Sequence, residues 1–179
     1  MMDHFREEVV VKRNRFLDDI FYVFANILMV VTGFLAIYWM NVVTSANFSW
    51  IALIIFLVMG ASCAGLFFYR DRLKAEYEYT FTNGDLDFAI VYNNKKRKSL
   101  GTMRVKNVDA FGPVNSEGFR KLINMPELKR RNWFLNRDAN LYYFYYQKES
   151  NRNIIVLEPS EELVDMIRKY LPMGAYRPQ

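Results

Sequence analysis

Two long apolar stretches interrupt an otherwise strongly charged chain. They cover residues 20–40 and 50–69, and no charged side chain occurs from Ile20 to Tyr69. Each stretch has about 20 residues, which at a rise of ~1.5 Å per residue matches the ~30 Å hydrocarbon core of a bilayer. The connection, residues 41–49, is uncharged and short. The pattern therefore predicts a hairpin of two transmembrane helices.

The positions of basic and aromatic residues predict how this hairpin is oriented. Four basic residues precede the first span and three follow the second within residues 70–74, whereas the connection carries none. Segments rich in Lys and Arg stay on the cytoplasmic side. Aromatic rings such as Trp39 and Trp50 mark the span ends, where amphipathic rings prefer the headgroup region. We therefore expect a multi-pass protein of the cytoplasmic (inner) membrane with both termini in the cytoplasm.

The second span contains small residues four positions apart, a spacing that lets helix backbones approach closely. These candidate helix-packing residues are Gly60, Ala61, Ala64 and Gly65. We expect them to pack against the first span through Gly33 and Ala36, and the alternative is a homo-oligomer interface. Neither span contains Asp, Glu, Lys, Arg or His, which argues against an ion or proton pathway.

The region after the hairpin, residues 70–179, has the alternation of β-strands. Tyr, Phe and polar residues alternate over residues 75–81, and Asn83-Gly84 is a strong signal for a type I′ hairpin turn. A return strand over 86–92 and a second turn at Asn93-Asn94 follow. Further strands are predicted over residues 99–105, 108–114, 140–148 and 153–157. Residues 1–19 are read as a separate, partly helical cytoplasmic arm, with His4 an exposed bystander.

Two features near the C-terminus complete the predicted fold. The strand over 140–148 is aromatic on both faces, so either it is a central strand or one face, Tyr142–Tyr146, contacts a partner. After it, Ser160 is a natural N-cap for an amphipathic helix that Pro172 ends. The predicted class is therefore membrane α+β: a two-helix transmembrane hairpin (20–69), then a small antiparallel sheet or partly open barrel (70–179) capped by a C-terminal helix.

Two segments of this pattern resemble a known family. They are E-Y-E-Y-T-F-T-N-G-x-L-D, within residues 76–87, and L-E-P-S-E-E-L-V-D-M-I, within residues 157–167. Together with the two spans they resemble bacterial two-span membrane proteins with a pleckstrin-homology-like (YcxB-like) cytoplasmic domain, an uncharacterised family. The resemblance implies a bent seven-strand sheet capped by the C-terminal helix. Residues 115–139 depart from it, because they are longer and more basic than a simple strand connection.

Composition narrows the possible functions. The sequence has one Cys and one His, which leaves no disulfide scaffold and too few ligands for most zinc or haem sites. It contains no glycine-rich phosphate loop and no common hydrolase motif. We therefore expect no enzyme activity, no cofactor and no metal. Residues 70–179 hold 20 basic and 14 acidic residues without a motif that reads nucleic acid, so nucleic acid is not an expected partner.

Two basic stretches are the candidate contact sites. We expect the first, Lys95, Lys96, Arg97 and Lys98, to fill the turn after the second strand. The second contains Lys129, Arg130 and Arg131, followed by Trp133, which could either enter the membrane interface or lie in the core. A basic residue near an anionic leaflet gains about 1 kcal/mol, so anionic phospholipids are possible ligands. The two functions that fit are a protein-interaction or scaffold module held at the inner leaflet and a module that binds anionic headgroups.

Overall fold

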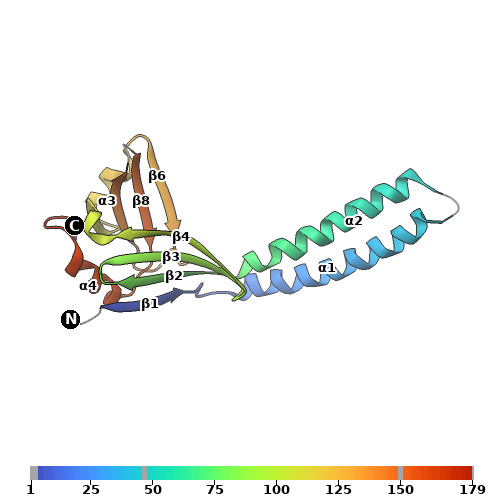
Figure 1. The fold of residues 1–179 in the computed structure, drawn as a ribbon, viewed down its shortest axis with the longest axis horizontal. Coiled ribbons are helices and arrows are strands. Elements are labelled where there is room, and N and C mark those ends of the chain that lie inside the picture. Colours follow the sequence, from blue (N-terminus) through green and yellow to red (C-terminus); the bar gives the residue numbers. More distant parts are fainter. Residues whose placement is uncertain (1–3, 46–47, 149–150, 179) are drawn as a thin grey trace. The chain divides into compact units, whose positions relative to one another are not determined.

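The computed structural model describes residues 4–45, 48–148 and 151–178. The chain divides into two compact units, which Figure 1 shows in ribbon form. The helical unit consists of Asn14–Ala75 and Tyr92–Lys95. The sheet unit consists of Met1–Arg13, Glu76–Val91 and Lys96–Gln179.

The helical unit contains two long apolar helices, α1 (Phe16–Val43) and α2 (Trp50–Tyr69), followed by the 3-10 turn η1 (Arg70–Lys74). Within the described residues, these two helices are long and apolar enough to cross a membrane. Only 11% and 6% of their most apolar windows are buried, so their surface is not used in a protein core. The predicted spans are confirmed as helices, and α1 extends beyond residues 20–40 at both ends.

Small side chains lie where α1 and α2 pack against each other. Ala25, Thr32 and Ala36 of α1 are buried, as is Ala52 of α2. The hydroxyl of Thr32 donates to the carbonyl oxygen of Leu28, 2.8 Å away, so this polar group is satisfied within its own helix. Short side chains at the contact let the two backbones approach without leaving polar atoms unpaired.

Sheet A of the sheet unit has the strand order β1-β2-β3-β4. Its strands are β1 (Phe5–Val10), β2 (Ala75–Thr82), β3 (Asp85–Tyr92) and β4 (Lys96–Arg104). The Asn83-Gly84 turn between β2 and β3 has φ angles of 49° and 96°, the left-handed conformation that a type I′ turn requires. Gly84 is required for a second reason, since a Cβ there would lie 2.7 Å from the Tyr170 ring.

Strand β1 corrects the expectation of a separate, partly helical arm: Phe5–Val10 form a strand of the sheet, and the helical part of the arm begins at Phe16, as the first residue of α1. Residues Phe5 to Val10 pair antiparallel with Thr82 to Tyr77 of β2. The segment alternates in burial, and its C-terminal Val9 and Val10 are β-branched residues that favour a strand. The available edge of β2, more than sixty positions away in the sequence, decides the conformation of this arm. A local reading of its charges missed that pairing.

Sheet B has the strand order β5-β7-β8-β6. Its strands are β5 (Ala110–Pro113), β6 (Leu128–Trp133), β7 (Tyr142–Lys148) and β8 (Asn151–Leu157). Strand β6 runs parallel to β8, whereas β5 and β8 are antiparallel to β7. The segment 115–139, which departed from the family pattern, supplies β6 and the short helix α3 (Glu117–Ile123). The described strands thus form two four-stranded sheets, more than the seven strands expected, and no closed barrel.

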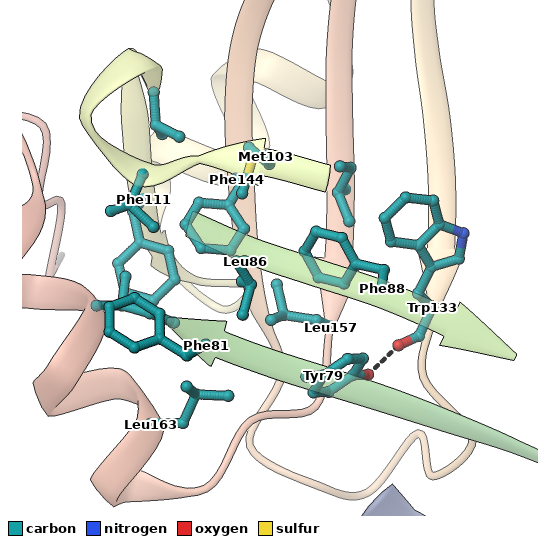
Figure 2. Packing of buried hydrophobic residues seen from close by; sticks show 14 of the residues in the cluster. Tyr79, Phe81, Leu86, Phe88, Met103, Phe111, Trp133, Phe144, Leu157 and Leu163 are labelled. Atoms are coloured by element: carbon teal, nitrogen blue, oxygen red, sulfur yellow. Dashed lines mark hydrogen bonds between the residues drawn. The ribbon is translucent and has the colours of Figure 1, made fainter. Parts of the chain in front are cut away.

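The main core lies between the inner faces of the two sheets (Figure 2). Its largest fully buried side chains include Phe81 and Phe88 of sheet A and Phe144 and Leu157 of sheet B. Helix α4 (Glu161–Tyr170) closes this core with Leu163, Val164 and Ile167. The predicted N-cap is confirmed, because the Ser160 hydroxyl accepts a hydrogen bond from the Leu163 N–H at 3.2 Å.

Strand β7 is aromatic on both faces because sheet B is covered on both sides. Phe144 lies in the core between the sheets, and Tyr143 and Tyr145 lie in a second apolar cluster with Phe119 of α3. Tyr143 and Phe144 have no exposed surface and Tyr145 is 6% exposed. The strand is therefore central, and these side chains do not form the partner surface that was the other interpretation of Tyr142–Tyr146.

Candidate functional site: two basic sheet edges

The first basic stretch lies mostly in a strand. The three-residue turn Asn93 to Lys95 closes the β3–β4 hairpin, with φ angles of 50° at Asn93 and 52° at Asn94, so β4 begins already at Lys96. The prediction that all four basic residues fill the turn is therefore wrong, and Lys95 alone lies in it. Arg97 forms an ion pair with Glu78 on β2 at 2.5 Å. This hydrogen-bonded carboxylate raises the pKa of Arg97, which keeps its charge fixed.

Lys95 belongs to the helical unit, where the turn contacts the base of the helical hairpin. The Asn93 N–H donates to the carbonyl oxygen of Lys74 at 2.7 Å. The Asn93 side-chain amide donates to Asp71 at 2.8 Å and to the Tyr22 hydroxyl at 3.1 Å. Lys95 Nζ lies 3.9 Å from the same Asp71 carboxylate. These contacts hold Lys95 beside the ends of the two apolar helices.

The second basic stretch forms strand β6, at one edge of sheet B. Lys129, Arg130 and Arg131 are exposed on both faces of the strand. Trp133 at its end is 8% exposed and packs on Phe88, with ring centroids 4.6 Å apart. Trp133 is thus part of the core, the second of its two predicted placements, and does not enter the membrane interface.

Two tyrosines of β2 fasten the end of β6 to sheet A. The buried Tyr79 hydroxyl donates to the carbonyl oxygen of Trp133, the contact drawn as a dashed line in Figure 2. The Tyr77 hydroxyl donates to the Asn132 carbonyl oxygen at 3.4 Å. Burial raises the pKa of Tyr79, so its hydroxyl stays protonated and remains a donor. Strand β6 is therefore fixed at its C-terminal end while Leu128 to Arg131 form the open edge.

A cleft of about 260 Å³ opens between the two sheets beside β4 and β6. Its lining residues come from five strands: Phe88, Gly101, Thr102, Met103, Arg131, Trp133, Tyr146, Lys148, Asn153 and Ile155. The set contains two cations, Arg131 and Lys148, and no carboxylate. Thr102 donates to Asp87, which lies outside this lining. The cleft therefore combines an aromatic wall with a positively charged rim, a chemistry suited to an anionic group.

Two of the four small residues of α2 line a second, apolar groove within the helical unit. Gly60 and Ala64 lie there beside Cys63 of the same helix and Gly33 of α1. A Cβ on Gly33 would be 3.4 Å from Cys63 Sγ, whereas a Cβ on Gly60 or Gly65 would meet nothing within 4 Å. Ala61 is exposed. The four residues stay a prediction as packing residues.

A polar network between β1 and the start of α4 was not foreseen. The Ser160 N–H donates to Glu8 at 3.0 Å, and Arg6 reaches Glu162 at 3.0 Å. The Nδ1 atom of His4 lies 2.7 Å from the Tyr170 hydroxyl, so His4 is not the bystander expected. These contacts join residues about 150 positions apart, and no local sequence signal marks them. They fix the outer edge of sheet A in place.

In the part of the chain that the structure describes, no group of three His, Cys, Asp or Glu side chains could hold a metal ion. Comparison with known proteins identifies the class. The family model for the bacterial PH-like domain (DUF6106) matches residues 2–177. The chain belongs to this family, in agreement with the pleckstrin-homology-like resemblance of its strands and C-terminal helix. No curated protein and no solved structure matches the chain.

Proposed function

We propose that this protein is a membrane-anchored interaction module. In this account α1 and α2 hold the PH-like sheet unit at the cytoplasmic face of the inner membrane, where it recruits a protein partner and performs no chemistry. One observation carries the proposal: the second basic stretch is an exposed edge strand, β6, that also lines a cationic cleft. An open strand edge offers unpaired backbone groups to another chain.

The charge distribution supports the cytoplasmic side. All basic residues flank the apolar helices and none lies between Ile20 and Tyr69, the distribution that keeps both flanks in the cytoplasm. Reporter fusions at both termini test this part. Activity of a cytoplasm-specific reporter at the N- and C-terminus is expected, and a C-terminus outside would contradict the placement at the inner leaflet.

Purification of the full chain in mild detergent tests the recruitment. We expect a partner in stoichiometric amount with the unaltered protein and its loss with the variant Lys129→Gln, Arg131→Gln. The variant Arg120→Gln, Lys169→Gln removes the same charge from exposed positions outside β6 and is the matched control, which keeps the partner. If the unaltered protein co-purified with phospholipid and with no protein partner, the proposal would be contradicted.

Binding of anionic lipid is a second candidate, favoured by the position of Lys95. The contacts of Asn93 with Lys74 and Asp71 place Lys95 at the base of the apolar hairpin, where a spanning helix meets the headgroups. Native mass spectrometry of the full chain with phosphatidylglycerol tests this. Lys95→Gln is expected to reduce the bound lipid if the headgroup lies there, and equal lipid binding by both proteins would reject the site.

A further inference from the structure

Strand β6 has the regular geometry of a template for another strand. Each residue from Leu128 to Trp133 is in unbroken parallel register with Arg152 to Leu157 of β8. Strand β6 is the last in the order of sheet B, so within the described residues no strand pairs with its other side. A regular strand with an unpaired side presents a row of N–H and C=O groups that an extended peptide can satisfy.

The edge of sheet A formed by β4 is a poorer template. Gly101 within β4 has a φ of 141°, a conformation outside the ordinary strand region. Such a break bends an edge strand and interrupts its row of hydrogen-bonding groups, a means by which sheets avoid adding strands. Strand β6 has no residue with positive φ. An incoming segment therefore finds its continuous partner on β6.

The charges next to β6 specify the kind of segment. Along the strand, Lys129, Arg131 and Trp133 alternate with Arg130 and Asn132, so one face carries two cations before it reaches the aromatic wall of the cleft. Arg131 lies over the Trp133 ring, with 5.9 Å between guanidinium carbon and centroid. Neither Lys129 nor Arg131 is in an ion pair within the described residues, and the cleft lining has no carboxylate. A carboxylate side chain on the incoming strand would supply the missing charge.

We propose that β6 binds an extended acidic segment of a partner protein by strand addition, with carboxylate side chains directed to Lys129 and Arg131 of β6. The inference rests on the proposed recruitment function and names its partner class. A lipid headgroup would satisfy the cations and leave the unpaired backbone groups of β6 unused, so the strand geometry favours a peptide. Basic residues on an edge can also serve only to prevent aggregation, and in that case no acidic peptide would bind to β6.

The test uses the full chain in phosphatidylcholine nanodiscs and fluorescence anisotropy with labelled octapeptides. The probe is an alternating Glu-Val peptide, and the controls are an alternating Lys-Val peptide and a Glu-Val peptide with N-methyl groups on alternate residues. We expect the Glu-Val peptide alone to bind. Lys129→Gln with Arg131→Gln is expected to weaken its binding roughly tenfold or more, in line with the loss of charge-assisted hydrogen bonds. Arg120→Gln with Lys169→Gln, which removes the same charge from exposed positions outside β6, is the matched control and leaves binding unchanged.

Three outcomes would overturn the inference. Equal binding of the N-methylated peptide would show that charge alone holds the peptide and that β6 accepts no strand. If phosphatidylglycerol vesicles displaced the labelled peptide as well as the unlabelled peptide does, the cleft would be a headgroup site. Absence of peptide binding, while the full chain still purifies with a stoichiometric partner, would reject strand addition and leave the recruitment function standing.

Discussion

The two edges of sheet B differ in what covers them. Along β5, the chain's own C-terminal segment takes the place of a further strand: the Phe111 N–H donates to Ala175 at 2.8 Å, and the Arg177 N–H donates to Phe111 at 2.7 Å. Tyr176 forms a parallel bridge with Phe111. Along β6, Lys129 to Arg131 are exposed and lie beside a cationic cleft. The protein closes one edge with its own backbone and keeps charges on the other, and the proposed strand addition rests on this contrast.

The largest expected effect is at the closed edge. A Cβ on Gly112 would overlap the Arg177 carbonyl oxygen, so Gly112→Ala must displace either β5 or the C-terminal segment. We expect the free energy of unfolding to fall by about 2 kcal/mol or more, a typical cost of overpacking. Urea titration of the full chain in detergent, followed by circular dichroism, measures it.

Combining Gly112→Ala with a truncation of the C-terminal segment sharpens this prediction. Deletion of residues 175–179 removes the carbonyl group that the new methyl group would meet, so Gly112→Ala should cost much less in the truncated chain. Equal costs of Gly112→Ala in full and truncated chains would mean that the C-terminal segment does not close this edge.

The fixed end of β6 gives the next effect. Tyr79→Phe removes the hydroxyl that donates to Trp133 and accepts from the Glu158 N–H at 3.3 Å. A buried polar group without a partner costs about 1–3 kcal/mol, so a loss in that range is expected in the same urea titration. Tyr77→Phe, on the partly exposed Tyr77, should cost less. An equal or larger loss there would contradict the assignment of Tyr79 as the main contact.

The outer edge of sheet A predicts a smaller loss. The Ser160 hydroxyl caps α4 and also donates a hydrogen bond to the Glu8 carboxylate of β1. Ser160→Ala is expected to cost about 1 kcal/mol, the usual value of an N-cap, and to increase hydrogen exchange in β1. Ser160→Thr keeps the hydroxyl and should restore most of the stability. A loss confined to α4, with β1 unchanged, would show that this edge is held by other contacts.

Acid pH gives a minor effect at the same place. The Ser160 hydroxyl, the Glu162 N–H and Arg6 lower the pKa of Glu162 from its ordinary 4.5. A carboxylate with a lowered pKa stabilises the fold fully above the pKa of the unfolded chain, and this contribution is lost as the pH falls through the lower pKa of the folded protein. Glu162→Gln should therefore reduce stability slightly at pH 7, and the difference should shrink as the pH is lowered from 7 through the pKa of Glu162 in the folded protein. A constant difference between the two proteins across this range would contradict the assignment.

The smallest effect on stability belongs to the open edge. Lys129 and Arg131 are exposed and make no ion pair within the described residues, so Lys129→Gln with Arg131→Gln should change the free energy of unfolding by less than ~0.5 kcal/mol. Binding of the Glu-Val peptide should be lost. If this double substitution destabilised the protein strongly, Lys129 and Arg131 would contribute to the stability of the fold, and the contrast between the two edges would disappear.

The sequence predicted the parts of the fold that local patterns determine. The apolar spans, the Asn83-Gly84 turn and the Ser160 cap each follow from neighbouring residues. Strand β1 was missed because its conformation depends on pairing with β2, and β6 because a strand exposed on both faces has no alternation of apolar residues. The basic residues of the candidate site could be named, but the cleft beside them needs five strands from distant parts of the chain.

Hydrogen exchange measured residue by residue on the full chain in nanodiscs tests the contrast between the edges most directly. In the free protein, the Phe111 and Arg177 amides should exchange slowly, whereas the β6 amides that do not pair with β8 should exchange fast. Addition of the Glu-Val peptide should slow those β6 amides and leave β5 unchanged. Slow exchange of all β6 amides in the free protein, or fast exchange that the bound peptide does not alter, would contradict a partner strand on β6.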